Sequence, residues 1–554
     1  MKRILVKKDS YFDSVFLMLI TRELKGDPGV RDAIVAMGTP MNLELLAGLG
    51  YASPELAAAG PGDLVIAVEA ADEKAVEAAI LAAIELMKRK KTASSSESGT
   101  ARAGSVRAAA QALPDANVAV ISVPGAYAAR EARLALERGQ HVMLFSDNVS
   151  LEDEIALKRL AVSKGLLMMG PDCGTAIIGG MPLCFANVVR RGTVGIVAAS
   201  GTGLQEVCCL VDRYGSGVSQ AIGTGGRDLK NAAVGGMTSL LAIEALARDP
   251  ATTVLVVISK PPAPEVAAKV VEALERAGKP AVAHFLGMSV PKADTGRLAW
   301  AANLEEAARL AVAFANGAKD AAAARMAADS ASDPGGVADA SGGVAGNPGL
   351  TAQMTALAVR EAARLGPGQL FLRGLYTGGT VADEALFLAD AALGGVRSNN
   401  QTRKELLLAD PRVSVGHTIV DLGDDFFTAG KPHPMIDPAP RDERIRAEGA
   451  DAATAVLLLD VVLGYGSHAD PAGAASAAIA DARKAAAARG AYLPVVASVV
   501  GTAGDPQDAA AQRAKLEAAG ALVMPSNYRA ASLAVEIARL AIARGRANNN
   551  GGTK

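Results

Sequence analysis

Aromatic side chains are scarce in this chain of 554 residues. Phenylalanine, tyrosine and tryptophan together make up 3% of it, although half of all residues are hydrophobic. A sizeable core is therefore available, and aliphatic side chains and alanine must fill it. This composition suits alanine-rich helices packed closely on parallel sheets. A chain of this length is expected to contain several domains.

Cysteine is also rare. The four cysteines form no Cys-x-x-Cys pair and show no spacing typical of a disulfide framework or a thiolate metal site, so neither is predicted. Cys208 and Cys209 are neighbours on an expected helix and must point to different sides of it. Packing in the core is the first interpretation of these residues.

The chain also lacks an excess of one charge and any long apolar run. Its formal net charge of −2 gives no sign of binding to nucleic acid or to an acidic membrane surface. It shows no basic segment followed by a short apolar stretch, and no apolar run approaches the roughly 18 residues of a membrane-spanning helix. We therefore expect a cytoplasmic protein.

The hydrophobic pattern predicts an α/β fold made of several parts. The expected parts are a small N-terminal α/β unit (1–90), a Rossmann-like unit (105–190), a second α/β unit (191–316), a linker (317–348) and a third α/β unit (349–545). The linker is assigned because it is rich in alanine, glycine, aspartate and serine. A second, polar linker is expected at 91–104.

Glycine-rich turns follow several predicted strands. The turn Ser200-Gly201-Thr202-Gly203 comes directly after a buried strand and begins a helix. Its serine can cap that helix, and its glycines leave backbone N–H groups open to an anion. A similar turn, residues 376–380 (YTGGT), begins a helix in the third unit. Two ordinary capped turns, alike by coincidence, are the alternative interpretation.

A third turn, residues 223–228 (GTGGRD), lies close by in the sequence. In a parallel sheet such turns meet at the carboxyl ends of the strands, where ligands bind. The residues predicted to hold a phosphate or substrate anion are Ser200, Gly201, Thr202, Gly203, Gly225, Gly226, Gly378, Gly379 and Thr380.

Longer motifs indicate a family. Residues 117–316 resemble the α subunit of succinyl-CoA synthetase, through GLLMMGPDCGT, GTVGIVAASGT and AIGTGGRDL, and residues 415–535 more distantly resemble the C-terminal domain of its β subunit. Nearly the whole chain resembles the FdrA family of acyl-CoA-synthetase-like proteins, through FSDNVSLEDEIALK, ASGTGLQE, LYTGGT, VDLGDDFFTAGKPHPMIDP and LLLDVVLGYG. The resemblance implies a Rossmann-like CoA-binding-type domain and two flavodoxin-like domains. It also implies a CoA-type cleft lined by Val123, Pro124, Gly170, Pro171, Asp172 and Cys173.

The chain departs from the synthetase pattern at its histidine. The stretch that matches the phosphohistidine motif, residues 291–298 (PKADTGRL), contains none, and His284 on the preceding strand is interpreted as a core or rim residue. Lys260 stands where the pattern has an acidic residue. The N-terminal glycine loop for CoA phosphates and an ATP-grasp domain are missing. A nucleotide-dependent ligase cycle is therefore not expected. CoA is the cofactor that the resemblance leaves open, with phosphate or carbamoyl phosphate as substrate.

Two anion-binding helix starts with added cations suit transfer of an acyl phosphate without a covalent enzyme intermediate. The predicted catalytic residues are Lys260, Arg227, His433 and Asp425, with Arg373 as a further cation before the third-unit turn. Lys260 beside two positive helix ends would be repelled unless an anion filled the cleft. His433 and Asp425 lie in a loop dense in ionisable groups, residues 420–441, for which a surface loop with aspartate-capped turns is the alternative.

The FdrA resemblance implies a carbamoyltransferase subunit of allantoin nitrogen catabolism, which converts oxalurate and phosphate into oxamate and carbamoyl phosphate. Two alternatives remain: an acyl-CoA ligase subunit that borrows its phosphohistidine elsewhere, and a non-catalytic regulatory subunit that binds an anionic metabolite. The expected partners are a small anionic metabolite and other subunits of the same enzyme or further copies of this chain. Nucleic acid and membranes are not expected.

Overall fold

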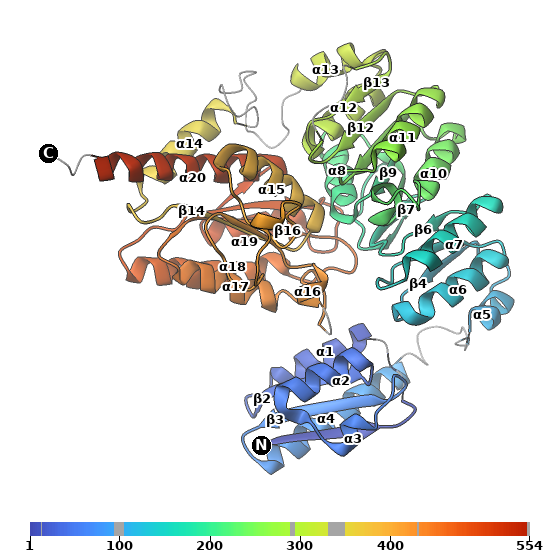
Figure 1. Ribbon diagram of the computed structural model, residues 1–554, viewed down its shortest axis with the longest axis vertical. Coiled ribbons are helices and arrows are strands. Elements are labelled where there is room, and N and C mark those ends of the chain that lie inside the picture. The colour runs from blue at the N-terminus through green and yellow to red at the C-terminus, as the bar shows by residue number, and fades with distance from the viewer. Residues whose placement is uncertain are drawn as a thin grey trace. The chain divides into compact units, whose positions relative to one another are not determined.

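The computed structural model describes residues 1–550 except residues 11, 13, 94–102, 104, 289–293, 331–349 and 429–430. The chain divides into two compact units (Figure 1). The first contains Met1–Pro114 together with Asp425–His433, and the second contains Asp115–Asp424 and Pro434–Lys554. Among the described residues, no helix has both the length and the apolar character needed to cross a lipid bilayer.

The first unit is built on a three-stranded antiparallel sheet with the strand order β1-β3-β2. Its strands are β1 (Lys2–Lys7), β2 (Val30–Met37) and β3 (Leu64–Ala70), and its main helices are α1 (Ser14–Lys25) and α4 (Glu73–Ala93). The central strand reads LVIAVEA and is buried almost throughout, because hydrophobic clusters cover both of its faces. The sheet and its helices make this a small α/β unit, as predicted for residues 1–90.

The second unit begins with a small parallel sheet of order β4-β5-β6. It is formed by β4 (Val118–Ile121), β5 (His141–Leu144) and β6 (Met168–Met169), with helices α6 (Gly125–Glu137) and α7 (Leu151–Ser163). Gly125 allows the start of α6 to lie against the next loop, because a Cβ there would lie 2.4 Å from the carbonyl oxygen of Asp147. The backbone of that loop therefore covers the start of α6.

A seven-stranded sheet follows, with the order β13-β12-β11-β9-β10-β7-β8. Its five parallel strands are β9 (Arg191–Ala199), β10 (Val218–Gly223), β11 (Val254–Ser259), β12 (Ala281–Phe285) and β13 (Leu298–Trp300), and the antiparallel hairpin of β7 (Thr175–Ile178) and β8 (Met181–Cys184) forms one edge. Helices α8 (Gly201–Arg213) and α12 (Leu304–Ala315) pack in one core cluster, and α10 (Met237–Arg248) and α11 (Pro264–Arg276) in another. Such two-sided cover is typical of a parallel sheet.

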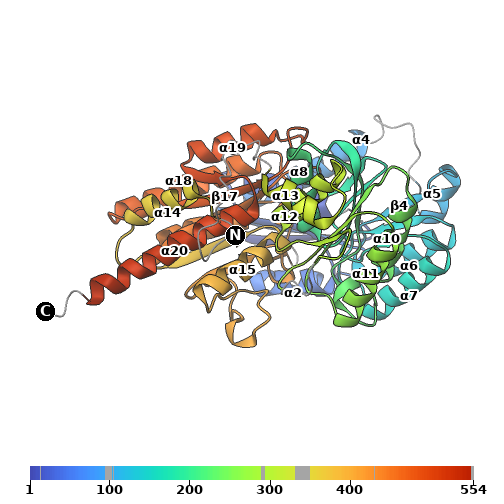
Figure 2. The same ribbon diagram turned by 90° about the horizontal axis from the view of Figure 1, so that it is seen from above.

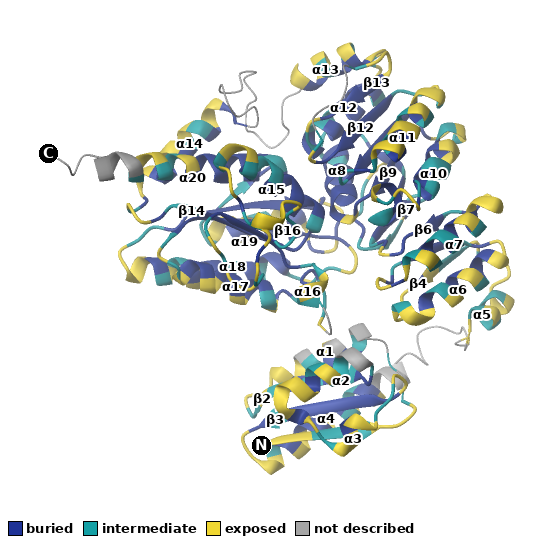
Figure 3. Ribbon diagram, viewed as in Figure 1, coloured by how far each residue is buried: buried dark blue, intermediate teal, exposed yellow. Residues whose placement is uncertain are grey.

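The last part contains a five-stranded parallel sheet of order β15-β14-β16-β17-β18. The strands are β14 (Phe371–Tyr376), β15 (Thr418–Asp421), β16 (Thr454–Val462), β17 (Val495–Val500) and β18 (Ala521–Met524). Helices α14 (Ala352–Ala363), α15 (Gly379–Leu393) and α20 (Asn527–Asn550) lie on one face, and α17 (Ala439–Ala450) and α18 (Pro471–Ala488) on the other (Figures 1 and 2). The strands of both large sheets are buried (Figure 3). The predicted α/β class is confirmed.

The predicted linker is partly helical. Residues Ala321–Ser330 form α13, which packs on α12 through Ala321, Ala324 and Ala328. The run of alanines that suggested a linker instead favours a helix, because alanine has the highest helix propensity. The rest of the predicted linker, residues 331–348, lies outside the described residues.

Three buried glutamates from three helices meet at the start of α20. Glu206 of α8 accepts a hydrogen bond from the backbone N–H of Asn527 (2.9 Å), and Glu384 of α15 accepts one from its side-chain amide (2.8 Å). Glu305 of α12 pairs with Arg529. Burial raises the pKa of Glu206 and of Glu384 to about 7. The contacts fix α8 and α15 relative to each other, which matters because these helices carry the two predicted anion-binding turns.

A buried lysine joins the Rossmann-like part to the seven-stranded sheet. Lys158 of α7 donates to the carbonyl oxygen of Thr224 (2.9 Å) and forms ion pairs with Asp228 (2.6 Å) and Glu154 (3.1 Å). None of the three charged side chains has more than 1% of its surface exposed. Arg227 also pairs with Glu154 (2.7 Å), so four charges and nearby hydrogen bonds compensate one another.

We expect Lys158→Met to lower the free energy of unfolding by about 3–5 kcal/mol, because it leaves Asp228 buried without its cation and leaves Glu154 paired with Arg227 alone. Urea denaturation would measure the loss. The control is Arg446→Met, since Arg446 pairs with Asp481 at the surface, where an ion pair contributes up to about 1 kcal/mol. Equal losses in the two variants would contradict the assignment.

Candidate functional site

The structure brings the turns at Ser200 and Gly378 together as two facing helix starts. Ser200 caps α8 by accepting the N–H of Gly203 (3.1 Å), and its hydroxyl donates to Thr380 Oγ1 (2.8 Å). The backbone N–H of Thr380 donates to Thr202 Oγ1 (3.2 Å) in return. Both helices have more than eight residues, so each presents the positive end of its dipole here.

The space directly between the two helix starts is filled. A Cβ on Gly378 would lie 2.6 Å from Thr202 Cγ2, and one on Gly203 would lie 2.9 Å from Thr380 Cγ2. The solvent-facing part of the site consists of Gly201, which is exposed, and Gly379, which is partly exposed. No hydrogen bond from the N–H of Gly201, Thr202 or Gly379 is found within the described residues, and of these three residues Gly201 and Gly379 have exposed surface.

The other donors of the third-unit turn are occupied by the protein itself. Asp460 of β16 accepts the N–H groups of Thr377 (2.8 Å) and Gly378 (2.8 Å) and the Thr377 hydroxyl (3.0 Å). Its carbonyl oxygen accepts from the buried guanidinium of Arg441 (2.7 Å). A carboxylate of the protein thus takes the place that an external anion would have at this turn. Gly378 is therefore a structural residue rather than a ligand contact.

Lys260 follows β11 and lies beside the helix starts, but it is paired. Its ammonium group lies 2.7 Å from Asp383 Oδ2, with 31% of the side chain exposed. Burial acts to lower the pKa of Lys260, but Asp383 and Asp421 outweigh it and raise that pKa. The expectation of an ammonium that needs a substrate anion is therefore wrong, because carboxylates already compensate it. Asp383 lies one helical turn after Gly379, a spacing that places both on one face.

Arg227 and Gly225 serve the packing of the chain. The Arg227 guanidinium forms an ion pair with Glu154 (2.7 Å) and donates to the carbonyl oxygen of Val149 (2.8 Å). Gly225 has φ +84°, and a Cβ there would lie 2.3 Å from the carbonyl oxygen of Pro171. Both residues have structural contacts of their own, and their predicted role at the anion site stays a prediction. Gly226, in the same turn, is half-buried.

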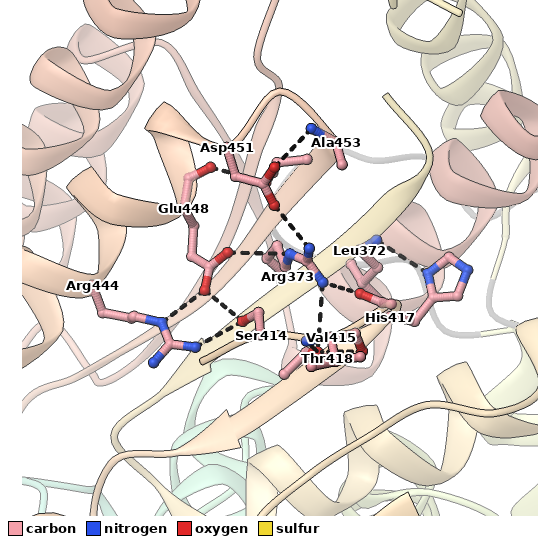
Figure 4. A network of polar contacts seen from close by, with 12 residues as sticks. Leu372, Arg373, Ser414, Val415, His417, Thr418, Arg444, Glu448, Asp451 and Ala453 are labelled. Atoms are coloured by element: carbon pink, nitrogen blue, oxygen red, sulfur yellow. Dashed lines mark hydrogen bonds and ion pairs between the residues drawn. The ribbon is translucent and has the colours of Figure 1, made fainter. Parts of the chain in front are cut away.

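Arg373 is likewise structural. Its guanidinium pairs with Glu448 (3.1 Å) and Asp451 (2.9 Å) and also contacts the carbonyl oxygen of Gly416 (Figure 4). Only 3% of the side chain is exposed. Arg373 lies near the amino end of β14, whereas the turn is at its carboxyl end. The expectation of a substrate-facing cation at this position is therefore wrong.

The residues of the predicted CoA-type cleft lie together but differ in access. Ser146 joins two of its loops, because its hydroxyl donates to Val123 O (2.6 Å) and its carbonyl oxygen accepts the N–H of Asp172 (3.0 Å). Pro124 and Asp172 are exposed. Gly170 and Pro171 are buried, as is Cys173, whose pKa burial raises to about 12. Cys173 is a core residue, and the lining of a cleft by all six residues is not observed.

Asp425 and His433 belong to the first compact unit, and Asp425 begins the short helix α16 (Asp425–Thr428). The structure therefore groups them with the N-terminal residues and not with Lys260. Sequence reasoning placed them in the same loop as Asp421, which instead ends β15 in the second unit.

Two family models match the chain. Residues 375–537 match the model described as CoA-ligase, and residues 1–103 match the model described as AllF, heavy metal-associated domain. The α/β fold and these matches define an acyl-CoA-synthetase-like protein. The chain belongs to the family of YahF from Escherichia coli (strain K12), an uncharacterized protein to which it is 44% identical over 534 residues, with 96% of this chain and 98% of YahF covered.

Other relatives are CoA ligases. The succinate–CoA ligase subunit alpha of Aquifex aeolicus is 30% identical over 187 residues, which span 32% of this chain and 58% of that subunit. The sulfoacetate–CoA ligase subunit SauD of Bilophila wadsworthia is 30% identical over 118 residues, 20% of this chain and 40% of SauD. The structure of acetyl-coenzyme A synthetase 1 from Ca. Korarchaeum cryptofilum is 17% identical to this chain, with a TM-score of 0.27. The match covers 79% of this chain and 85% of that one.

The heavy-metal description of the N-terminal family does not fit the residues present. Residues 1–103 contain neither cysteine nor histidine, the ligands that soft metal ions prefer. The loop after β1 is held by contacts within the protein. Lys8 pairs with Asp63 (2.8 Å), and the N–H of Asp9 donates to the same carboxylate (3.0 Å). No group of three metal-ligating side chains occurs in the described part of the chain.

We therefore expect no tight binding of Zn²⁺ or Cu⁺ when the intact chain is titrated in a calorimeter. Cys184 is the only cysteine with appreciable exposed surface, so Cys184→Ser serves as the control for adventitious thiol binding. Stoichiometric, tight binding that persists in this variant would contradict the expectation.

His284 is a core residue, in agreement with the first alternative of its prediction. Only 3% of it is exposed, its Nδ1 contacts the carbonyl oxygen of Ala301 (2.9 Å), and burial lowers its pKa to about 4. Residues 291–293 of the stretch matched to the phosphohistidine motif lie outside the described residues. A buried, backbone-bonded imidazole is a poor acceptor for a phosphoryl group.

We expect no phosphorylated form of this chain. Incubation with labelled ATP, or with a labelled acyl phosphate, should leave no acid-labile label after gel filtration. The succinate–CoA ligase subunit alpha of Aquifex aeolicus, treated in parallel, is the comparison protein. Stoichiometric label on His284 or on His433 would show the expectation to be wrong.

Proposed function

We propose that this chain is a subunit of an acyl-phosphate-dependent transferase that acts without a phosphohistidine. The observation that carries the proposal is the pair of facing helix starts, with the N–H groups of Gly201, Thr202 and Gly379 left for an external anion. Backbone N–H groups at a helix start bind phosphate, and the dipole favours its charge. The reaction we propose is that of oxalurate with phosphate to give oxamate and carbamoyl phosphate.

In this reaction the chain's part is binding and charge stabilisation. The N–H groups of Gly201 and Thr202 hold phosphate oxygens, and Gly379 donates from the opposite helix. Because Ser200, Thr202 and Thr380 tie the two helix starts together, these donors are fixed before the ligand arrives. Preorganised donors of this kind stabilise developing negative charge without reorganisation. Lys260 lies beside these donors, and its charge is already compensated by Asp383.

An acyl-CoA ligase subunit is the second candidate, because the CoA-ligase family match and the succinate–CoA ligase relatives favour it. In that case CoA is the cofactor, and the exposed residues Pro124 and Asp172 mark the part of the Rossmann-like sheet that would receive it. A phosphohistidine would then come from another chain. We further propose other subunits of the same enzyme as partners and the cytoplasm as location.

We expect Gly201→Val to weaken phosphate binding by about tenfold to a hundredfold, because a β-branched side chain covers N–H donors whose bonds to a charged oxygen contribute about 1.5–3 kcal/mol. Folding should be unaffected, since a Cβ at Gly201 meets no atom within 4 Å. The matched control is Gly368→Val in an exposed turn, where a Cβ also meets no atom. Calorimetry with inorganic phosphate measures the difference.

Activity is tested with the chain alone and together with the proteins encoded beside it. Phosphate-dependent release of carbamoyl phosphate from oxalurate supports the transferase. Formation of an acyl-CoA from succinate, CoA and ATP would support the ligase instead. Equal phosphate affinity of wild type and Gly201→Val would rule out the helix-start site itself.

A further inference from the structure

Asp421 and Lys260, from two separate segments, meet beside Gly379. A Cβ built on Gly379 would lie 2.5 Å from Asp421 Oδ2 and 3.7 Å from Lys260 Nζ. Asp421 ends β15, Lys260 follows β11, and Gly379 begins α15. Because glycine has no side chain, the Asp421 carboxyl lies directly against the accessible helix start. It is therefore next to the N–H group that we assign to the anion.

The carboxyl groups at this point outnumber the cations. Lys260 is paired with Asp383, while Asn400 Nδ2 donates to Asp421 Oδ2 (3.0 Å) and lies 3.4 Å from Asp383 Oδ1. The N–H of Gly423 donates to Asp421 Oδ1 (2.9 Å). Asp421 and Asp383 are 6% and 7% exposed. Two buried carboxyl groups that share one ammonium cannot both ionise easily.

Lys260 forms an ion pair with Asp383 and not with Asp421 among the described residues. Asp383 has the direct ion pair, so Asp421 is the group left without a cation of its own. Burial is the main reason that the pKa of Asp421 is raised to about 7, and the charge of Asp383 raises it further against the opposing effect of Lys260. Asp172 is a third carboxylate that acts on Lys260. A carboxyl group whose pKa lies near neutral pH is suited to acid–base catalysis.

We propose that Asp421 is the acid–base residue of the reaction at the helix starts, and that Lys260 and Asp383 are residues that position and tune it. This inference rests on the proposed transferase function. It assigns Asp421 a part that the anion-binding donors cannot perform, since backbone N–H groups do not exchange the reacting proton. The proposed substrate is a compound that carries an acyl group on an amide nitrogen.

The proposed step conserves bonds and protons. A phosphate oxygen attacks the carbamoyl carbon of oxalurate, so an O–C bond forms. The C–N bond to the oxamate nitrogen breaks, its electron pair stays on that nitrogen, and Asp421 donates its proton there. The proton lost by hydrogen phosphate then returns to the Asp421 carboxylate. In the reverse direction the carboxylate removes a proton from the amide of oxamate.

The pH dependence has opposite signs in the two directions. Cleavage of oxalurate needs protonated Asp421, so kcat is highest below the pKa and falls as pH rises through about 7. Synthesis from carbamoyl phosphate and oxamate needs the carboxylate, so kcat rises through the same range. A flat kcat profile between pH 5.5 and 8.5, roughly the range that spans this pKa, would overturn the proposal without any variant.

The variants give a second test. Asp421→Asn should lower kcat by about 10²–10⁴-fold and remove the limb of the kcat profile, that is, the change of kcat with pH near the pKa of Asp421. Phosphate affinity measured by calorimetry should stay close to that of wild type. Asp481→Asn at the surface of α18 is the control. Lys260→Met should move the limb to higher pH and Asp383→Asn to lower pH, because they remove an opposite charge and a like charge from beside Asp421.

The outcomes separate the two proposals. If wild type with its partner proteins cleaves oxalurate and Asp421→Asn does so equally well, the role of Asp421 is wrong and the transferase stands. Shifts of the limb in the same direction in Lys260→Met and Asp383→Asn would also overturn that role. If wild type shows no cleavage in any combination of subunits, the transferase falls and the role of Asp421 falls with it.

Discussion

The arrangement of the site depends on the contacts of three buried glutamates with the start of α20. Glu206 and Glu384 come from the two helices whose first turns face each other, and both bind Asn527. A buried carboxyl group is costly unless its oxygens are bonded, so these helices have few alternative positions. Because burial raises the pKa of both groups to about 7, their stabilising contribution is complete below about pH 4.5 and is lost as pH rises through 7. Stability and catalytic geometry are thus linked through the same residues.

Much of the fold could be predicted from the sequence, because buried parallel strands give a clear signal. The buried strand predicted directly before Ser200 is β9, which ends at Ala199. The prediction failed at β15, whose apolar part is only Thr418–Val420 between glycine-rich segments. That omission mattered, because β15 carries Asp421 to the point beside Gly379. A four-residue strand gives too short a pattern to distinguish from a loop.

The candidate site could be predicted in part for a related reason. Helix caps are local signals, so Ser200 and the glycines around it were recognisable from the sequence alone. Charge partners are not local: Glu154 for Arg227, Asp383 for Lys260 and Glu448 for Arg373 lie 73, 123 and 75 residues away along the chain. Each of these cations looked free in the sequence and is paired in the structure. The carboxylates, rather than the cations, therefore give this site its chemical character.

One hydrophobic cluster extends through both large sheets, from Ile196 and Leu204 to Val381, Leu458 and Leu533. The succinate–CoA ligase relative of Aquifex aeolicus is a subunit alpha, and the similar part spans 32% of this chain. Here the two sheets are joined within one polypeptide, so the second sheet cannot be diluted away from the first, and the effective concentration of the partner surface is set by the chain itself. The facing helix starts are consequently present at any protein concentration.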